Sequence, residues 1–181
     1  MSQNLKLLKK DETLKSIQLD PKFKYEIAKE PGGASIKYCF QCGKCTATCP
    51  IRRLEEDYKP RQILRASLLG LREAVLSSNT IWLCVSCFSC SERCPQGVRL
   101  TDVIRAIRNI AVKEGYIHPF FKAQGEMIAN AGRTFDSAEF INEQRADLDL
   151  PPVPIVNIDE VSKILENTKV KEILARTQKG E

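Results

Sequence analysis

The sequence predicts an all-α protein, and three observations support this fold class. Apolar residues recur with the helical period of 3.6 in several segments, most clearly over 63–76 and 103–111. Few stretches show the strict alternation of apolar and polar residues that marks a half-buried strand. One helical segment lies between two cysteine-rich runs of identical spacing, so the chain is arranged around a repeated motif.

The repeated motif reads C-x2-C-x2-C-x3-C-P in both copies. Cysteines 39, 42, 45 and 49 form the first run, and cysteines 84, 87, 90 and 94 form the second. This is the bacterial spacing for [4Fe–4S] ligation, in which the fourth cysteine of each run ligates the other cluster. The sequence therefore predicts two [4Fe–4S] clusters with crossed ligands. We expect Cys39, Cys42, Cys45 and Cys94 to hold cluster 1, and Cys84, Cys87, Cys90 and Cys49 to hold cluster 2.

Two other uses of eight cysteines are less consistent with the sequence. Disulfides need an oxidising compartment, and nothing in the chain indicates one. Two all-cysteine zinc sites would usually show paired C-x2-C knuckles, whereas here each run is a triple followed by Cys-Pro. His118 is the only histidine and is expected to have a surface or packing role, because the cysteines already fill both sites.

Composition and charge agree with an iron–sulfur protein. The 181 residues are 43% hydrophobic and 28% charged, which is ordinary for a globular domain with extended ends. The formal net charge is +5, and two oxidised clusters of about −2 each would bring the total to roughly +1. We therefore expect no nucleic-acid partner. No apolar run approaches a membrane span of roughly 18 residues, and the first residues lack the apolar core of a signal peptide, so we expect a cytoplasmic location.

The elements are expected in the following order. Residues 1–19 form a Lys-rich arm, and Asp20-Pro21 starts a helix that Pro31-Gly32-Gly33 stops. Further helices are expected over 60–76, 101–114, 121–131, 136–146 and 159–166, with a last piece over 170–174. Thr101, Asp136 and Asp159 are the expected caps, and Arg105, Arg108 and Lys113 are expected on the outer face of their helix. We divide the chain into an N-terminal arm and helix (1–33), a two-cluster core (34–117) and a helical extension for subunit docking (118–181).

The doubled motif with a helix between its copies resembles the α-helical ferredoxin domain of succinate dehydrogenase and fumarate reductase subunits. The stretches 38–46 and 81–84, together with Cys94-Pro95 in a short chain, closely resemble the small iron–sulfur subunit, the C subunit, of the methanogen heterodisulfide reductases. The chain lacks the N-terminal [2Fe–2S] motif of the succinate dehydrogenase type. It also lacks a Cys-Cys-Gly run and a Gly-x-Gly-x-x-Gly nucleotide fingerprint.

This resemblance implies an electron-transfer subunit of an oxidoreductase complex, with no substrate site and no catalytic residue of its own. It would relay single electrons from a flavin-containing subunit to a catalytic subunit that reduces the coenzyme M–coenzyme B disulfide. An associated hydrogenase is a further partner that the resemblance allows. The alternative is the iron–sulfur subunit of a fumarate reductase-like or glycolate oxidase-like complex.

The two runs differ in polarity. The first contains Gly43 and Lys44, whereas the second contains Val85 and Phe88. A nearby cation stabilises the more negative reduced cluster, so the sequence favours a higher potential for cluster 1.

Overall fold

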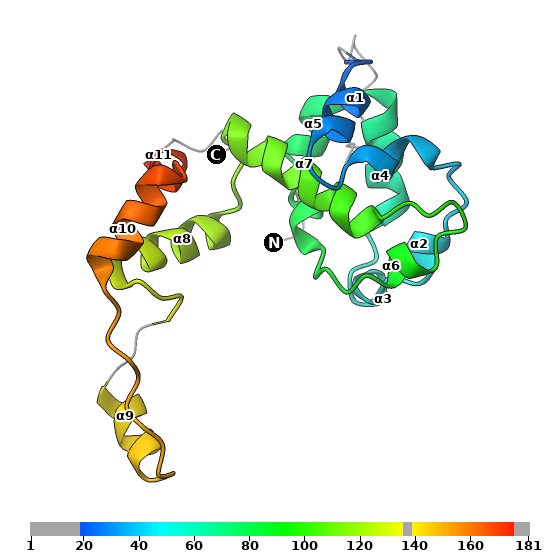
Figure 1. The fold of residues 1–181 in the computed structure, drawn as a ribbon. Coiled ribbons are helices and arrows are strands. Elements are labelled where there is room, and N and C mark those ends of the chain that lie inside the picture. The colour runs from blue at the N-terminus through cyan, green and yellow to red at the C-terminus, as the bar shows by residue number, and fades with distance from the viewer. Residues whose placement is uncertain (1–18, 136–138, 176–181) are drawn as a thin grey trace. The chain divides into compact units, whose positions relative to one another are not determined.

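The computed structural model describes residues 19–135 and 139–175. The expected arm over residues 1–18 and the expected cap Asp136 lie outside this part of the chain. All regular elements of the described residues are helices, which confirms the all-α class (Figure 1). The chain divides into two compact units, the first reaching Tyr116 and the second beginning at Ile117.

The first unit contains the cysteine runs and the main core. Its elements are α1 (Phe23–Lys29), the 3-10 helix η1 (Ala34–Tyr38), α2 (Lys44–Ala47), α3 (Pro50–Leu54), α4 (Pro60–Leu69), α5 (Arg72–Leu76), the 3-10 helix η2 (Asn79–Leu83), α6 (Ser89–Glu92) and α7 (Leu100–Glu114). Helix α7 packs against α1, α5, α6 and both 3-10 helices. Its buried stripe, which includes Val103, Ile107 and Ile110, meets Phe23 and Ile27 of α1 in one apolar core. The amphipathic pattern of α7 thus organises the unit.

Each cysteine run contains a single helical turn that precedes its last cysteine. Helix α2 lies within the first run and α6 within the second, and the two turns pack against each other (Figure 1). Pro50 is the first residue of α3 and directly follows Cys49. Proline is favoured at that position because its fixed φ suits the helix start and its missing N–H would be unpaired there.

The stretch 60–76 between the two runs forms two helices, α4 and α5, instead of the single expected one. Gly70 ends α4 in the left-handed region, with φ at +82°. Its carbonyl accepts a hydrogen bond from the backbone N–H of Asp20 at 2.8 Å. A Cβ at Gly70 would lie 2.3 Å from the Asp20 carbonyl oxygen. A contact with a distant segment therefore breaks a helix that the apolar period alone would continue.

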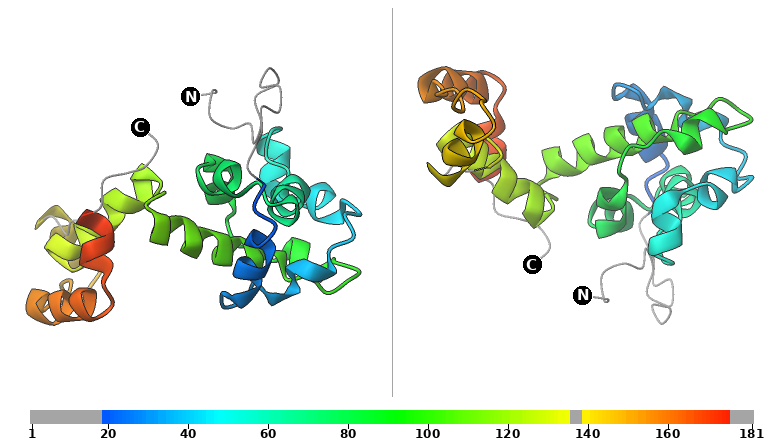
Figure 2. Two further views of the ribbon diagram at one scale, coloured as in Figure 1. Left: turned by 90° about the horizontal axis from the view of Figure 1, so that it is seen from above. Right: turned by 90° about the horizontal axis from the view of Figure 1, so that it is seen from below.

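The second unit consists of α8 (Pro119–Ala131), α9 (Glu139–Ala146), α10 (Ile158–Asn167) and α11 (Val170–Ala175). Helices α8, α10 and α11 pack against one another, as the yellow-green, orange and red ribbons of Figure 2 show. The His118 side chain caps α8 by accepting from the Phe120 N–H, a role that the sequence analysis had not expected, since it assigned this histidine a surface or packing role. Asn157, and not Asp159, caps α10, because its side chain accepts from the N–H groups of Asp159 and Glu160.

We predict that Gly70→Ala lowers the thermal midpoint of the cluster-loaded protein more than Gly97→Ala does. Both glycines have positive φ, but a Cβ at Gly97 would meet nothing within 4 Å. The control therefore carries only the left-handed conformational cost of about 1–2 kcal/mol. The Gly70 variant adds the collision with Asp20. Equal midpoints for the two variants in anaerobic thermal unfolding would contradict this account.

Candidate metal centres

The two cysteine runs adopt the same local backbone conformation. The third and fifth residues of each run have positive φ: Gln41 (66°) and Gly43 (86°) in the first, Ser86 (54°) and Phe88 (62°) in the second. The left-handed region is rare for residues other than glycine, so its repetition at matching positions indicates a shared requirement of the two loops.

The first site is a cavity, open to solvent, with about 380 Å³ of empty space between the first run and the end of the second. Cys39, Cys42, Cys45 and Cys94 line it, together with Cys90. Apolar side chains, among them Leu64 and Leu100, form its inner wall. The structure thus brings together the four cysteines that the motif assigns to cluster 1.

The second site is a neighbouring cavity, open to solvent, with about 330 Å³ of empty space. Cys84, Cys87, Cys90 and Cys49 line it, and Tyr58, Thr101 and Ile104 form part of its wall. The four cysteines that the motif assigns to cluster 2 therefore also surround one cavity. Cys90 lines both cavities, so the two sites are direct neighbours.

Hydrogen-bond donors are directed at the sulfur atoms, as anionic thiolate ligands require. At the first site, Gln41 Nε2 donates to Cys39 Sγ and the Val98 N–H donates to Cys94 Sγ, both at 3.3 Å. At the second site, the Thr101 hydroxyl lies 3.6 Å from Cys90 Sγ. Four cysteines around a largely apolar cavity, with donors directed at some of the sulfurs, fit a cubane iron–sulfur cluster.

The acidity of the cysteine thiols depends on how far each one is buried. Burial raises the pKa of Cys45 to about 11, and it also raises the pKa of Cys90. The exposed Cys87 shows the opposite direction, because the backbone N–H and hydroxyl of Ser89 stabilise its thiolate and lower its pKa. Iron binding must therefore displace protons from the half-buried thiols, which couples cluster loading to proton release.

Three residues near the second site were not predicted from the sequence. Tyr58 is 1% exposed and interacts with the thiol of Cys84 through its hydroxyl. Thr101 is not the cap of α7, which begins at Leu100, but a buried residue facing Cys90. Arg108 does not lie on the outer face as expected: its guanidinium donates to the carbonyls of Ile81 and Cys84 at 2.8 and 2.7 Å.

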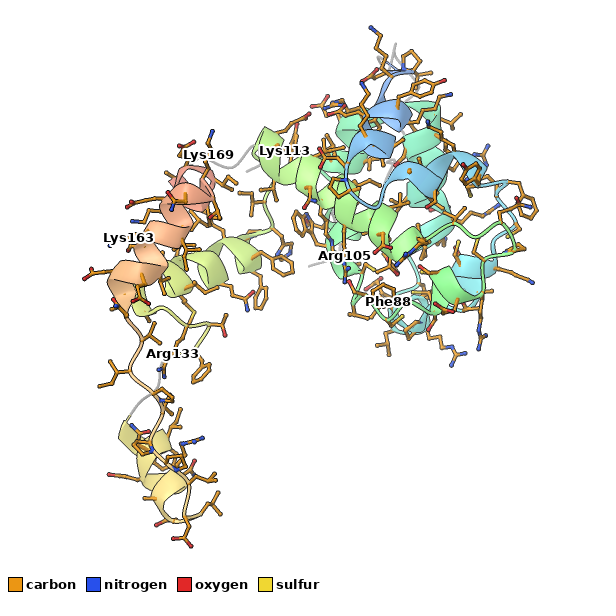
Figure 3. All side chains as sticks on the ribbon, viewed as in Figure 1. Phe88, Arg105, Lys113, Arg133, Lys163 and Lys169 are labelled. Carbon is orange, nitrogen blue, oxygen red and sulfur yellow. The ribbon has the colours of Figure 1, made fainter. Side chains whose placement is uncertain are left out.

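Phe88 and Arg105 form a second contact between α7 and the cysteine loop. The Arg105 guanidinium lies 5.2 Å from the centre of the Phe88 ring (Figure 3). This stacking offsets part of the cost of holding a phenylalanine in the left-handed region, where the first loop uses Gly43. Gly43 and Phe88 occupy equivalent positions and share the left-handed conformation. Gly43 adopts it because it lacks a Cβ, whereas Phe88 is supported by its contact with Arg105.

The chain matches the family model of the 4Fe-4S dicluster domain over residues 35–98. It is therefore an iron–sulfur protein with two [4Fe–4S] clusters, as the motif predicted. It is 35% identical over 93% of its length to the C subunit of the H(2):CoB-CoM heterodisulfide,ferredoxin reductase of Methanothermobacter marburgensis, covering 94% of that protein. It is 31% identical over 87% of its length to the iron-sulfur C subunit of the CoB–CoM heterodisulfide reductase of Methanopyrus kandleri, covering 88%. The chain belongs to the family of heterodisulfide reductase C subunits.

This membership confirms the resemblance seen in the sequence and makes the chain an iron–sulfur subunit of an oxidoreductase complex. The chain is also 31% identical to the C subunit of the Ferredoxin:CoB-CoM heterodisulfide reductase of Methanosarcina mazei. The match covers 79% of this chain and 91% of that protein. In the part of the chain that the structure describes, no helix combines the length and apolarity needed to cross a bilayer.

We predict that Thr101→Val lowers the midpoint potential of one of the two clusters. The substitution keeps the shape of a buried side chain but removes the hydroxyl beside Cys90 Sγ. A hydrogen bond to sulfur stabilises the more negative reduced state, so its loss makes reduction harder. Thr101→Ser retains the hydroxyl and serves as the control. Potentiometric titration followed by electron paramagnetic resonance (EPR) measures both midpoints, and identical values in the two variants would refute the prediction.

Proposed function

We propose that this chain relays single electrons from a flavin-containing subunit to a catalytic subunit that reduces the coenzyme M–coenzyme B disulfide. The observation that carries the proposal is the pair of adjacent four-cysteine cavities in a chain of this family. Each bound [4Fe–4S] cluster supplies one-electron chemistry, which matches a relay between a flavin and a disulfide. Family membership favours this role over the fumarate reductase-like or glycolate oxidase-like alternative. We propose the cytoplasm as its location.

The proposed ligand sets are crossed. Cys39, Cys42, Cys45 and Cys94 hold cluster 1, and Cys84, Cys87, Cys90 and Cys49 hold cluster 2. Two features support this assignment: the fourth cysteine of each run lines the cavity of the other run, and the following proline turns the chain away. Cys90 lines both cavities, so the two clusters would be close neighbours, which favours rapid transfer between them.

Cysteine-to-serine variants test the crossing. We predict that Cys49→Ser and Cys87→Ser alter the same midpoint potential, and that Cys94→Ser and Cys42→Ser alter the other one. The reason is that replacing a sulfur ligand with oxygen changes the potential of the cluster that it holds. EPR-monitored titration of each variant gives the grouping. If Cys49 groups with Cys42, the ligands are not crossed.

The second unit is proposed to dock onto a partner subunit of the complex. Leu165 is its only buried residue within the described part. Large apolar side chains are instead exposed: Ile155 (100%), Leu148 (70%), Phe120 (63%), Phe140 (62%) and Ile164 (60%). A unit with so small a core gains stability when such surface is buried against another protein. Lys163 on α10 and Arg133 after α8 are labelled in this unit in Figure 3.

We predict that Ile155→Asp weakens assembly without altering the clusters. Ile155 is fully exposed, so a carboxylate there leaves the folding of this chain unchanged but opposes burial in an apolar interface. Pull-down of the partner subunits from native cell extract should fall by about tenfold or more, while iron content stays at that of the wild type. Lys163→Asp places the same carboxylate at an exposed polar position on α10, and this variant should retain the partner subunits. Equal recovery of partners by the two variants would argue against docking through this surface.

Anaerobic purification from native cells tests the functional assignment. We expect about eight irons per chain, the content of two [4Fe–4S] clusters, and co-elution of a flavin subunit and a Cys-Cys-Gly-rich subunit. Co-elution with a dicarboxylate or hydroxy-acid oxidoreductase would keep the clusters but reject the disulfide as the terminal acceptor.

A further inference from the structure

Arg108 of α7 donates hydrogen bonds to the backbone at the start of the second cysteine run. Its Nε donates to the Ile81 carbonyl at 2.8 Å and its Nη2 donates to the Cys84 carbonyl at 2.7 Å. The guanidinium lies 5.5 Å from the centre of the Trp82 ring. Three contacts therefore fix a cation against the backbone of the first cysteine of this run.

Arg108 is the cation nearest to the start of the second run that has no carboxylate partner in the described part of the chain. Among the described residues, no carboxylate lies within ion-pair distance of its guanidinium, whereas Arg105, one turn earlier, pairs with Asp102 at 3.6 Å. Burial lowers the pKa of Arg108, and the nearby Cys84 thiolate opposes this shift. Guanidinium nevertheless remains protonated in proteins, so the site carries a full positive charge.

We propose that Arg108 raises the midpoint potential of the cluster bound by Cys84. This inference rests on the proposed ligand sets. With four thiolates, a [4Fe–4S] cluster becomes more negative by one charge when it accepts an electron. A fixed, partly buried cation stabilises the more negative state most, because low dielectric and little salt screening strengthen the attraction. Arg108 is a positioning and tuning residue, since it contacts the carbonyl of Cys84 and not the iron.

The first site has cations of a different kind. Lys44 and Arg61 line its cavity, but both side chains are exposed to solvent. Water and salt screen an exposed charge, so its influence on a cluster is smaller than that of a partly buried one. The sequence had favoured the first cluster for the higher potential on the basis of Lys44. The helical pattern predicted Arg108 on the outer, solvent-facing side of α7, but the structure places its positive charge beside the backbone of Cys84.

The test compares two substitutions of Arg108 in the full chain with both clusters loaded. Arg108→Gln removes the charge and keeps a hydrogen-bond donor, whereas Arg108→Lys keeps the charge. Lys113→Gln is the matched control, because Lys113 is on the same helix but is exposed and paired with Glu30. Cys87→Ser identifies which midpoint belongs to the second cluster.

We expect Arg108→Gln to reduce the equilibrium constant for reduction of the second cluster by about tenfold, which is about 59 mV for a one-electron couple. The midpoint of the first cluster should not change, and both midpoints of Arg108→Lys and Lys113→Gln should stay near those of the wild type. An unchanged second midpoint in Arg108→Gln with full iron content overturns the proposal. If Arg108→Gln loses iron, the result of Arg108→Lys is used instead. A tenfold fall in the equilibrium constant for reduction of the second cluster in Arg108→Lys would show that the charge is not the cause. Failure of the ligand assignment is seen separately, in the cysteine-to-serine series.

Discussion

The fold depends on holding two groups of four sulfur atoms around two adjacent cavities. The last cysteine of each run lines the cavity of the other run, so residues 39–49 and 84–94 must lie together although α3, α4, α5 and η2 separate them in sequence. The short turns α2 and α6 pack against each other, and α7 packs against α6. The thiols of Cys45 and Cys90 are consequently half-buried, and this partial burial opposes their ionisation in the absence of iron.

The sequence predicted much of this arrangement because the cysteine spacing and the helical period are local signals. The all-α class and the two clusters followed from them and are confirmed. The left-handed ends at Gly115 and Gly132 were also visible as glycines after apolar stripes. The ligand pairing stays a proposal, which the lining of the two cavities supports.

The features missed by the sequence analysis depend on contacts between distant segments. The break at Gly70 requires Asp20 to approach from the start of the chain. Arg108 falls on the side of α7 that a helical projection assigns to solvent, but the loop at Ile81–Cys84 folds over that side. Thr101 resembles a cap in sequence, whereas its place in the first turn of α7 directs it to Cys90. Periodicity identifies the apolar face of a helix but does not show which loops cover the rest.

The two units have different physical characters, which fits a chain that works within a larger complex. The first has a closed apolar core around the cavities, and the second exposes most of its large apolar side chains. The most direct test of the central claim is reoxidation of the native complex after reduction, followed by EPR. The account predicts that adding the coenzyme M–coenzyme B disulfide reoxidises both clusters of this chain. Clusters that stay reduced with the disulfide but are reoxidised by fumarate would contradict it.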